Sequence, residues 1–503
     1  MCLALPLSAT VRLGAPFVDG AVLQAGRPVP VWGVAAGGAC VTVSFAGQEK
    51  MARADATGAW QVSLDAMEPS SEGRVLSAVE RGGGASRIVI SDVLVGEVWV
   101  CSGQSNAECP LWGPDPRFRD GNGALYAMLT DMPDVRYVKT PNVMAIEPRR
   151  DVSVRWTKMT AHELTDPKVA KPSAMGFYFA TLLASSLHVP VGLVDSTWGG
   201  TNIDAWTPRS GYEGKPELAV ECAWPSMTRD AWRQEMAKGP ISAAVQQPSV
   251  LWNAMVAPYV PMAVRGVIWY QGCHNNGEAL RYGSKLHALY DGWSREFRNP
   301  DLRFRLVQLA PYKCSWFELQ LQQAKFAAEE KNAEIAIAND VGNLTDIHPN
   351  DKRTVAARLV ALTLRHDYGR TDVKSDSPTL ASWRVADGAF VLTFDHAESW
   401  FLYHDDKGDT STGFEIAGAD GVWHKARLEN VDVPIHPKTG EPNFRGGVRG
   451  RELVVRAEDV AAPKALRYLY SHPWFGALKN EVGLPLGAFR VDVPTTPKGK
   501  TQP

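Results

Sequence analysis

The stretch Val93-Leu-Val-Gly-Glu-Val-Trp-Val-Cys-Ser-Gly-Gln-Ser-Asn106 decides the fold of this chain of 503 residues. It opens with a nearly continuous apolar run, which is typical of a strand covered on both faces. The run gives way to Gly103, and Ser105 follows. In parallel α/β sheets ligands bind beyond the carboxyl ends of strands, so Ser105 is placed as a candidate nucleophile. Taken alone, the segment also fits an ordinary loop serine, and it lacks the Gly-x-Ser-x-Gly pattern of the α/β-hydrolase elbow.

Strands and helices alternate after this stretch. Strand-like runs occupy residues 189–194, 264–270, 302–309 and 334–338, and helical patterns occupy 173–187, 278–297, 316–331 and 351–366. Such alternation predicts a parallel sheet with helices on both faces. We therefore expect an α/β catalytic domain over residues 91–370. Within it, residues 107–170 are rich in Pro and Asp and are interpreted as a long functional loop region.

β-rich sequence flanks this domain on both sides. Residues 8–90 contain short strand-like runs bounded by glycines and no helical period, which predicts an N-terminal β-sandwich-like domain. Residues 371–495 return to strands and predict a C-terminal β-rich domain. The remaining residues, 496–503, are polar and contain Pro and Lys, so we expect a disordered tail.

Composition narrows the function classes. The net charge of −2 gives no electrostatic footprint for nucleic acid or an anionic membrane, and no apolar run reaches the roughly 18 residues of a membrane span. Seven cysteines without a CxxC pair argue against a disulfide framework or zinc ribbon. Cys101 and Cys109 are close enough in sequence to pair, but free thiols are favoured. The segment that begins at Met1 is too short for a full secretory signal. The expected location is therefore the cytoplasm, or the periplasm or cell exterior if a leader was removed.

Three further motifs follow predicted strands. Residues 195–206 contain two adjacent glycines, whose N–H groups can approach a ligand closely, as an oxyanion hole requires. Residues 269–276 offer an Asn side chain, and also His274, although a lone loop histidine is more often a surface residue. Asp346 and His348 offer an imidazole beside a carboxylate. Each of these motifs could instead be an ordinary turn, and Asp346 with His348 could instead bind a metal. Because the four motifs follow successive predicted strands, however, one common site is favoured.

Together the four motifs resemble those of the sialate O-acetylesterase-type branch of the SGNH, or GDSL-like, hydrolases. The resemblance spans most of residues 15–365 and is carried by segments 96–106, 189–201, 266–272 and 346–349, with Val22–Gln24 and Val29–Gly33 near the start. It implies a flavodoxin-like α/β/α domain with a parallel sheet and appended β-domains. It also implies hydrolysis of acetyl esters without a cofactor or metal.

The resemblance also implies roles for individual residues. The catalytic residues would be Ser105, His348 and Asp346, and the oxyanion hole would consist of the Ser105 N–H, Gly200 (or Gly199) and Asn275. The assignment of Asp346 as the catalytic acid is the least certain by position, because many such enzymes place this acid three residues before the histidine. This chain has Thr345 there. Asp340, or a backbone carbonyl, is the alternative. The family's Gln-Gly-Glu-x-Asn motif here has Cys273 in place of Glu.

The function that the resemblance implies is removal of O-acetyl groups from sugars. The alternatives are an acetylesterase of plant polysaccharide (xylan or xyloglucan), a metal-dependent hydrolase, or a non-catalytic carbohydrate-binding protein on a hydrolase scaffold. The expected partner is an O-acetylated sugar or oligosaccharide, and the sequence does not fix the oligomeric state. Candidate substrate-binding residues are Gln104, Gln271 and Trp198, and further candidate sugar platforms are Trp112, Trp206 and Trp269.

Overall fold

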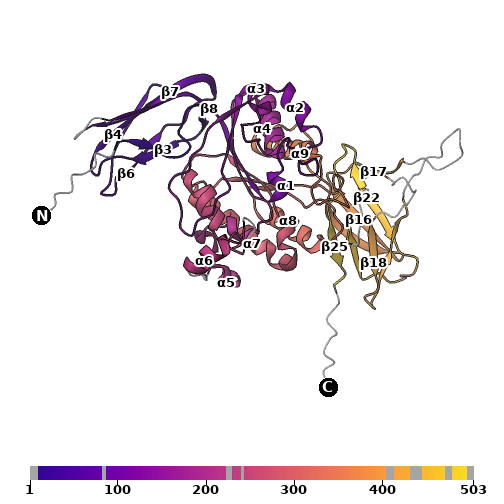
Figure 1. The fold of residues 1–503 in the computed structure, drawn as a ribbon. Coiled ribbons are helices and arrows are strands. Elements are labelled where there is room, and N and C mark those ends of the chain that lie inside the picture. Colours follow the sequence, from indigo (N-terminus) through magenta and orange to yellow (C-terminus); the bar gives the residue numbers. More distant parts are fainter. Residues whose placement is uncertain are drawn as a thin grey trace.

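The computed structural model describes residues 10–81, 86–222, 229–239, 243–403, 413–430, 445–470 and 478–494. Along the chain it consists of N-terminal strands, a central α/β part and a C-terminal β-rich part, which Figure 1 shows in indigo, magenta to orange, and yellow. The predicted tail at 496–503 lies outside the described residues. Among the residues described, no helix is both long and apolar enough to cross a membrane.

The N-terminal strands form two sheets, as expected. One sheet is antiparallel and consists of β1 (Arg12–Leu13), β3 (Val29–Val34) and β6 (Ala59–Leu64). The other consists of β4 (Cys40–Phe45), β5 (Gln48–Arg53) and β7 (Ser70–Arg81), and it continues into β8 (Arg87–Gly103), on which β2 (Val22–Gln24) also pairs.

A large mixed sheet forms the centre of the molecule, in the order β10-β9-β11-β8-β12-β13-β14. Every neighbouring pair on this path is parallel except β10 with β9. Beside β8, its strands are β9 (Asp131–Lys139), β10 (Thr157–Thr160), β11 (Val191–Thr197), β12 (Gly266–Tyr270), β13 (Arg303–Val307) and β14 (Ala333–Ala336). The strand that carries the first motif therefore lies in the middle of the sheet, as its apolar run predicts.

The segment 107–170 is not the long loop that its composition suggested. It contains two strands of the central sheet, β9 and β10, and the helices α2 (Gly123–Leu129) and α3 (Ala161–Thr165). The run Val135–Val138 is buried in β9, but Pro133 and acidic residues precede it and obscure the strand pattern. Tertiary pairing with β11 decides this strand.

Two pairs of helices cover the sheet on opposite sides (Figure 1). On one side α4 (Ala174–Leu187) packs against α9 (Lys352–Asp367), and on the other α7 (Tyr282–Glu296) packs against α8 (Phe317–Glu329). Ser173 caps α4 by accepting the Gly176 N–H at 3.1 Å, and Asp351 caps α9 by accepting the Thr354 N–H at 2.9 Å. The four predicted helices are thus confirmed. Shorter helices are α1 (Ser105–Glu108), α5 (Ala219–Cys222) and α6 (Arg229–Met236).

Beside a small cluster of Tyr212, Leu218 and Ala288, the described residues contain two large hydrophobic cores. One is continuous from Val11 to Leu364 and joins the N-terminal strands to the α/β part, because β8 belongs to both. The other spans Phe390 to Val491. Around it lie β15 (Thr379–Ala386), β16 (Ala389–Asp395), β17 (Ser399–Tyr403), β18 (Phe414–Ala417), β19 (Trp423–Lys425), β20 (Arg427–Leu428), β21 (Arg445–Arg449), β22 (Glu452–Arg456), β23 (Ala465–Tyr468), β24 (Leu478–Asn480) and β25 (Phe489–Asp492).

Candidate active site

Three of the four sequence motifs meet because their strands end at one level. Gly103 at the end of β8 pairs with Thr197 of β11 on one side and with Tyr270 of β12 on the other. Beyond these ends lies an open hollow of about 550 Å³, which we call the strand-end hollow. It is lined by Gln104, Ser105, Glu108, Phe118, Trp198, Gly199, Gly200, Cys273, His274, Ile347 and His348. Residues from all four motifs therefore share one site.

Ser105 begins α1 directly after the strand end. The turn depends on Gly103, whose φ is +129° and where a Cβ would lie 2.3 Å from the Tyr270 carbonyl oxygen. The chain can pass so close to β12 only without a side chain at this position. Ser105 is half-buried, and within the described residues its Oγ makes no hydrogen bond, neither to His348 nor to another group.

His348 is held by Asp346. The His348 Nδ1 lies 3.3 Å from Asp346 Oδ1, and the same oxygen accepts the His348 backbone N–H at 2.9 Å. Phe118 packs edge-on against the imidazole at 5.0 Å between ring centroids. Burial and the nearby Lys352 ammonium lower the pKa of His348, although Asp346 opposes this. The ring is therefore neutral at neutral pH, as a proton acceptor must be.

Asp340, the alternative partner for His348, is engaged elsewhere. Arg358 binds both of its carboxylate oxygens at 2.7 Å, and Lys479 adds a further contact at 2.5 Å. These cations lower the pKa of Asp340 against the effect of burial. Of the two candidate acids, only Asp346 contacts the imidazole.

The two adjacent glycines differ in what their N–H groups do. The Gly199 N–H donates to Glu108 Oε2 at 2.6 Å, and a Cβ on Gly199 would lie 3.2 Å from that of Ser105. Gly200 has a φ of +70°, and its N–H has no partner among the described residues. An incoming oxyanion can therefore be bound by Gly200, whereas Gly199 serves to bring the loop close to the serine.

Asn275 is buried and its amide is oriented by its neighbours. Its Oδ1 accepts the Ile203 N–H at 3.0 Å and the Gln271 Nε2 at 2.7 Å. Its Nδ2 donates one hydrogen to Glu278 Oε1 at 2.5 Å, and the second hydrogen has no partner among the described residues. Asn275 does not itself line the strand-end hollow.

The predicted substrate-binding residues separate into two groups. Gln104 and Trp198 line the hollow, although Gln104 Oε1 also accepts the N–H groups of Gly272 at 3.1 Å and His274 at 3.3 Å. Gln271 is fully buried and holds Asn275 instead of reaching the hollow. The other sugar-platform candidates do not line it either: Trp206 and Trp269 are fully buried, and Trp112 bonds the Leu164 carbonyl and stacks on Lys171.

Sequence reasoning missed two features of the site. Glu108 lines the hollow three residues after Ser105, a spacing that puts both on one face of a helical turn. The second feature is a buried link between the nucleophile turn and the histidine loop. Lys352 Nζ donates to Asn106 Oδ1 at 2.6 Å and to the Pro349 carbonyl at 2.7 Å, while Asn106 Nδ2 donates to the Ile347 carbonyl at 3.0 Å.

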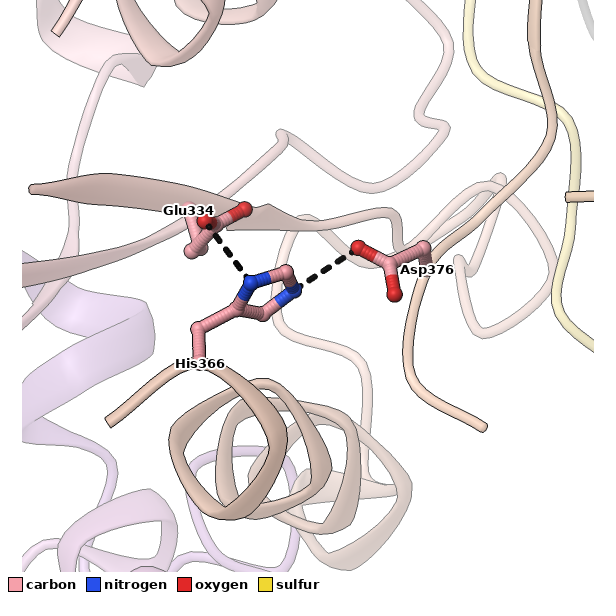
Figure 2. A group of neighbouring side chains, drawn as sticks. All are labelled: Glu334, His366 and Asp376. Atoms are coloured by element: carbon pink, nitrogen blue, oxygen red, sulfur yellow. Dashed lines mark hydrogen bonds and ion pairs between the residues drawn. The ribbon is translucent and has the colours of Figure 1, made fainter. Parts of the chain in front are cut away.

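One group of metal-ligand residue types occurs in the described part of the chain, away from the hollow. His366 lies between two carboxylates, with Nε2 at 2.8 Å from Asp376 and Nδ1 at 3.5 Å from Glu334 (Figure 2). Each carboxylate meets a different ring nitrogen. This arrangement suits a charged imidazolium with two partners, because one cation cannot bind both nitrogens of the same ring.

Six of the seven cysteines lie in the described residues, and these six are free thiols, as favoured from their number and spacing. The six in the described residues make no disulfide, and Cys2 lies outside them. Cys101 and Cys109 are both buried, and burial raises the pKa of Cys109 to about 11.

The chain is similar to known proteins in family model, in sequence and in structure. A family model described as carbohydrate esterase, sialic acid-specific acetylesterase matches residues 95–360. Sialate O-acetylesterase of Mus musculus is 28% identical over 436 residues, which cover 76% of this chain and 78% of that protein, and the Homo sapiens enzyme is 29% identical over 69% of both. A solved structure, a carbohydrate acetylesterase from Xanthomonas citri, is 31% identical with a TM-score of 0.79, covering 96% of this chain and all of that one.

Proposed function

The chain belongs to the sialic acid-specific acetylesterase family of carbohydrate esterases, and from that membership we propose that Ser105, His348 and Asp346 remove an O-acetyl group from a sugar through an acyl-enzyme. That the protein is a carbohydrate esterase follows from the family. The observation that carries the residue assignment is the geometry of the strand-end hollow. Ser105 and His348 line it together, and His348 is the histidine in it that an aspartate contacts.

The first half of the reaction forms the acyl-enzyme. Ser105 Oγ attacks the acetyl carbonyl carbon while His348 accepts the hydroxyl proton. Asp346 on Nδ1 keeps the ring in the tautomer whose Nε2 accepts, and stabilises the imidazolium that results. The tetrahedral intermediate then expels the sugar oxygen, which takes the proton from His348 and leaves as a hydroxyl. In the second half, His348 takes a proton from a water that attacks the acetyl carbonyl carbon. It then returns a proton to Ser105 Oγ as the bond from Oγ to that carbon breaks and acetate leaves.

The oxyanion is bound by the Ser105 N–H, the Gly200 N–H and the free hydrogen on Asn275 Nδ2. Loss of one such donor costs about 3–4 kcal/mol of transition-state stabilisation in other hydrolases. The free N–H of Gly200 and the fixed amide of Asn275 support this set. We further propose that the α/β part has the flavodoxin-like SGNH architecture, which the central position of β8 in the parallel strands supports.

The test is hydrolysis of a chromogenic acetate ester by the wild type, Ser105→Ala, His348→Ala and His274→Ala, each measured with and without a chelator. His274 also lines the hollow but makes no ion pair with a carboxylate among the described residues, so it is the matched control for His348. We expect Ser105→Ala and His348→Ala to lose at least roughly 10³-fold in kcat/KM, and His274→Ala to stay within about tenfold. Full activity of Ser105→Ala would remove the serine mechanism, and sensitivity to the chelator would favour a metal-dependent one.

The identity of the sugar requires a test of its own. The curated relatives are named for sialate, and the Xanthomonas citri protein only for carbohydrate. We propose O-acetylated sialic acid as the substrate. Acetylated plant polysaccharide is the alternative, because Cys273, which lines the hollow, replaces the glutamate of the family motif and can change the substrate preference. Acetate release from O-acetylated sialic acid and from acetylated xylan, compared by kcat/KM, decides between them.

A further inference from the structure

A second and larger hollow separates the N-terminal strands from the α/β part. Its volume is about 1130 Å³. Its walls are formed by β1, β3 and β6 with the neighbouring residues 53–57, and by residues 146–151, 208–210, 252–261 and 296–298. We call it the interdomain cleft. It shares no lining residue with the strand-end hollow, and it is large enough for an oligosaccharide rather than a single small group.

Arginines without ion-pair partners dominate the charge of the cleft. Its walls carry six arginines against four acidic residues and no lysine. Within the described residues, five of the six make no ion pair: Arg12, Arg53, Arg149, Arg150 and Arg298. Two of the acids are already engaged, since Asp55 accepts two backbone N–H groups of its own turn and Glu296 accepts the Ser210 hydroxyl at 2.6 Å. The cleft therefore offers guanidinium groups to an incoming anion.

Tryptophans supply the apolar part of the same walls. Trp32 is half-buried and its indole N–H has no partner among the described residues. The ring lies directly against the backbone of Gly14, where a Cβ would be 2.2 Å from the indole nitrogen, and Phe17 packs edge-on against it at 4.8 Å. Its place is therefore fixed by neighbours on the protein side. Trp60 and Trp252 also line the cleft but are buried, so Trp32 is the ring that offers a face to a sugar.

We propose that the interdomain cleft is an accessory binding site for an acidic glycan, one that carries a carboxylate on a neutral sugar chain. Guanidinium groups bind carboxylates through paired, charge-assisted hydrogen bonds, and indole rings accept the apolar faces of sugar rings. The choice of an acidic glycan as the ligand rests on the proposed sialate substrate. The cleft and its arginines without ion pairs are observed independently of that proposal. The site would hold the glycan chain while the acetyl ester is presented elsewhere.

The test uses the full chain with Ser105→Ala, so that binding is measured without catalysis. The probes are 3′-sialyllactose, its neutral counterpart lactose, and neutral xylohexaose, titrated by calorimetry and by saturation-transfer NMR. The cleft variant carries Arg150→Glu and Arg298→Glu, because both side chains are exposed and make no ion pair among the described residues. Its matched control is Arg87→Glu, an exposed arginine outside the cleft that likewise makes no ion pair in the described part of the chain. Equal melting temperatures establish that the variants are folded.

We expect sialyllactose to bind at least about tenfold more tightly than either neutral sugar, because a hydrogen bond to a charged group is stronger than one between neutral groups. The cleft variant should lose at least about tenfold in affinity for sialyllactose, and Arg87→Glu should lose none. Binding that the cleft variant retains would assign the glycan to the strand-end hollow and overturn the proposal. Equal affinity for the neutral sugars, or no binding of sialyllactose, would also overturn it. None of these outcomes depends on esterase activity, so the proposed function stands or fails on its own assay.

Discussion

Asp346 differs from the usual acid of such a site in its spacing, yet it contacts the imidazole of His348. We predict that Asp346→Asn lowers kcat/KM by about 10²–10⁴-fold, because the amide no longer stabilises the imidazolium. Burial and Lys352 place the pKa of His348 below its ordinary value, so wild-type activity should persist into mildly acidic solution. Asp346 raises that pKa, and its neutralisation should therefore move the acidic limb of the profile to still lower pH.

The measurement for Asp346 is kcat/KM against pH for the wild type, Asp346→Asn and Asp351→Asn. Asp351 is exposed and caps α9, and Asn caps a helix as well as Asp, so this control removes a nearby charge without removing a cap. The control should leave both the rate and the acidic limb unchanged. If Asp346→Asn also left both unchanged, the imidazole would be oriented by another group.

We propose that Glu278 positions Asn275 for the proposed oxyanion hole. It accepts Asn275 Nδ2 at 2.5 Å and the ammonium of Lys285 at 2.8 Å. We predict that Glu278→Ala lowers kcat by about tenfold with little change in KM, because a misplaced donor affects the transition state more than substrate binding. Glu278→Gln keeps an acceptor for Asn275 and should restore most of the rate. Equal losses in both variants would mean that the charge near Lys285, not the position of Asn275, matters.

At the scale of elements, the sequence predicted those that are decided locally. The apolar run of β8 and the four long helices after it appear where expected. Elements decided by pairing were missed, above all β9, whose buried run only becomes a strand beside β11. The same division holds in the site. Motif residues could be found from strand ends, but the roles of Glu108 and of the Asn106–Lys352 link could not, because both depend on contacts between distant segments.

At the scale of the whole molecule, His366 connects the α/β part to the segment that leads into the C-terminal strands. It lies near the end of α9, Glu334 lies on β14, and Asp376 precedes β15 (Figure 2). The hydrogen bond to Asp376 is the largest cause of a pKa of His366 above its ordinary value, and Glu334 adds to it. The charged imidazole therefore stabilises the fold below the unfolded-state pKa of about 6.5, and this stabilisation is lost as the pH rises through the higher folded-state pKa.

We predict that His366→Gln lowers the free energy of unfolding by about 1 kcal/mol or less at about pH 5.5, and that the difference from wild type disappears at about pH 8.5. Urea denaturation at both pH values measures it, with His162→Gln as control, because His162 is exposed and has no ion pair among the described residues. His348 acts in the opposite direction, since its lowered pKa costs stability in acid. That contribution is common to wild type and variant and cancels in the difference. If His366→Gln lowered the free energy of unfolding by the same amount at both pH values, His366 would stabilise the fold through packing. The charge between its two carboxylates would then not contribute.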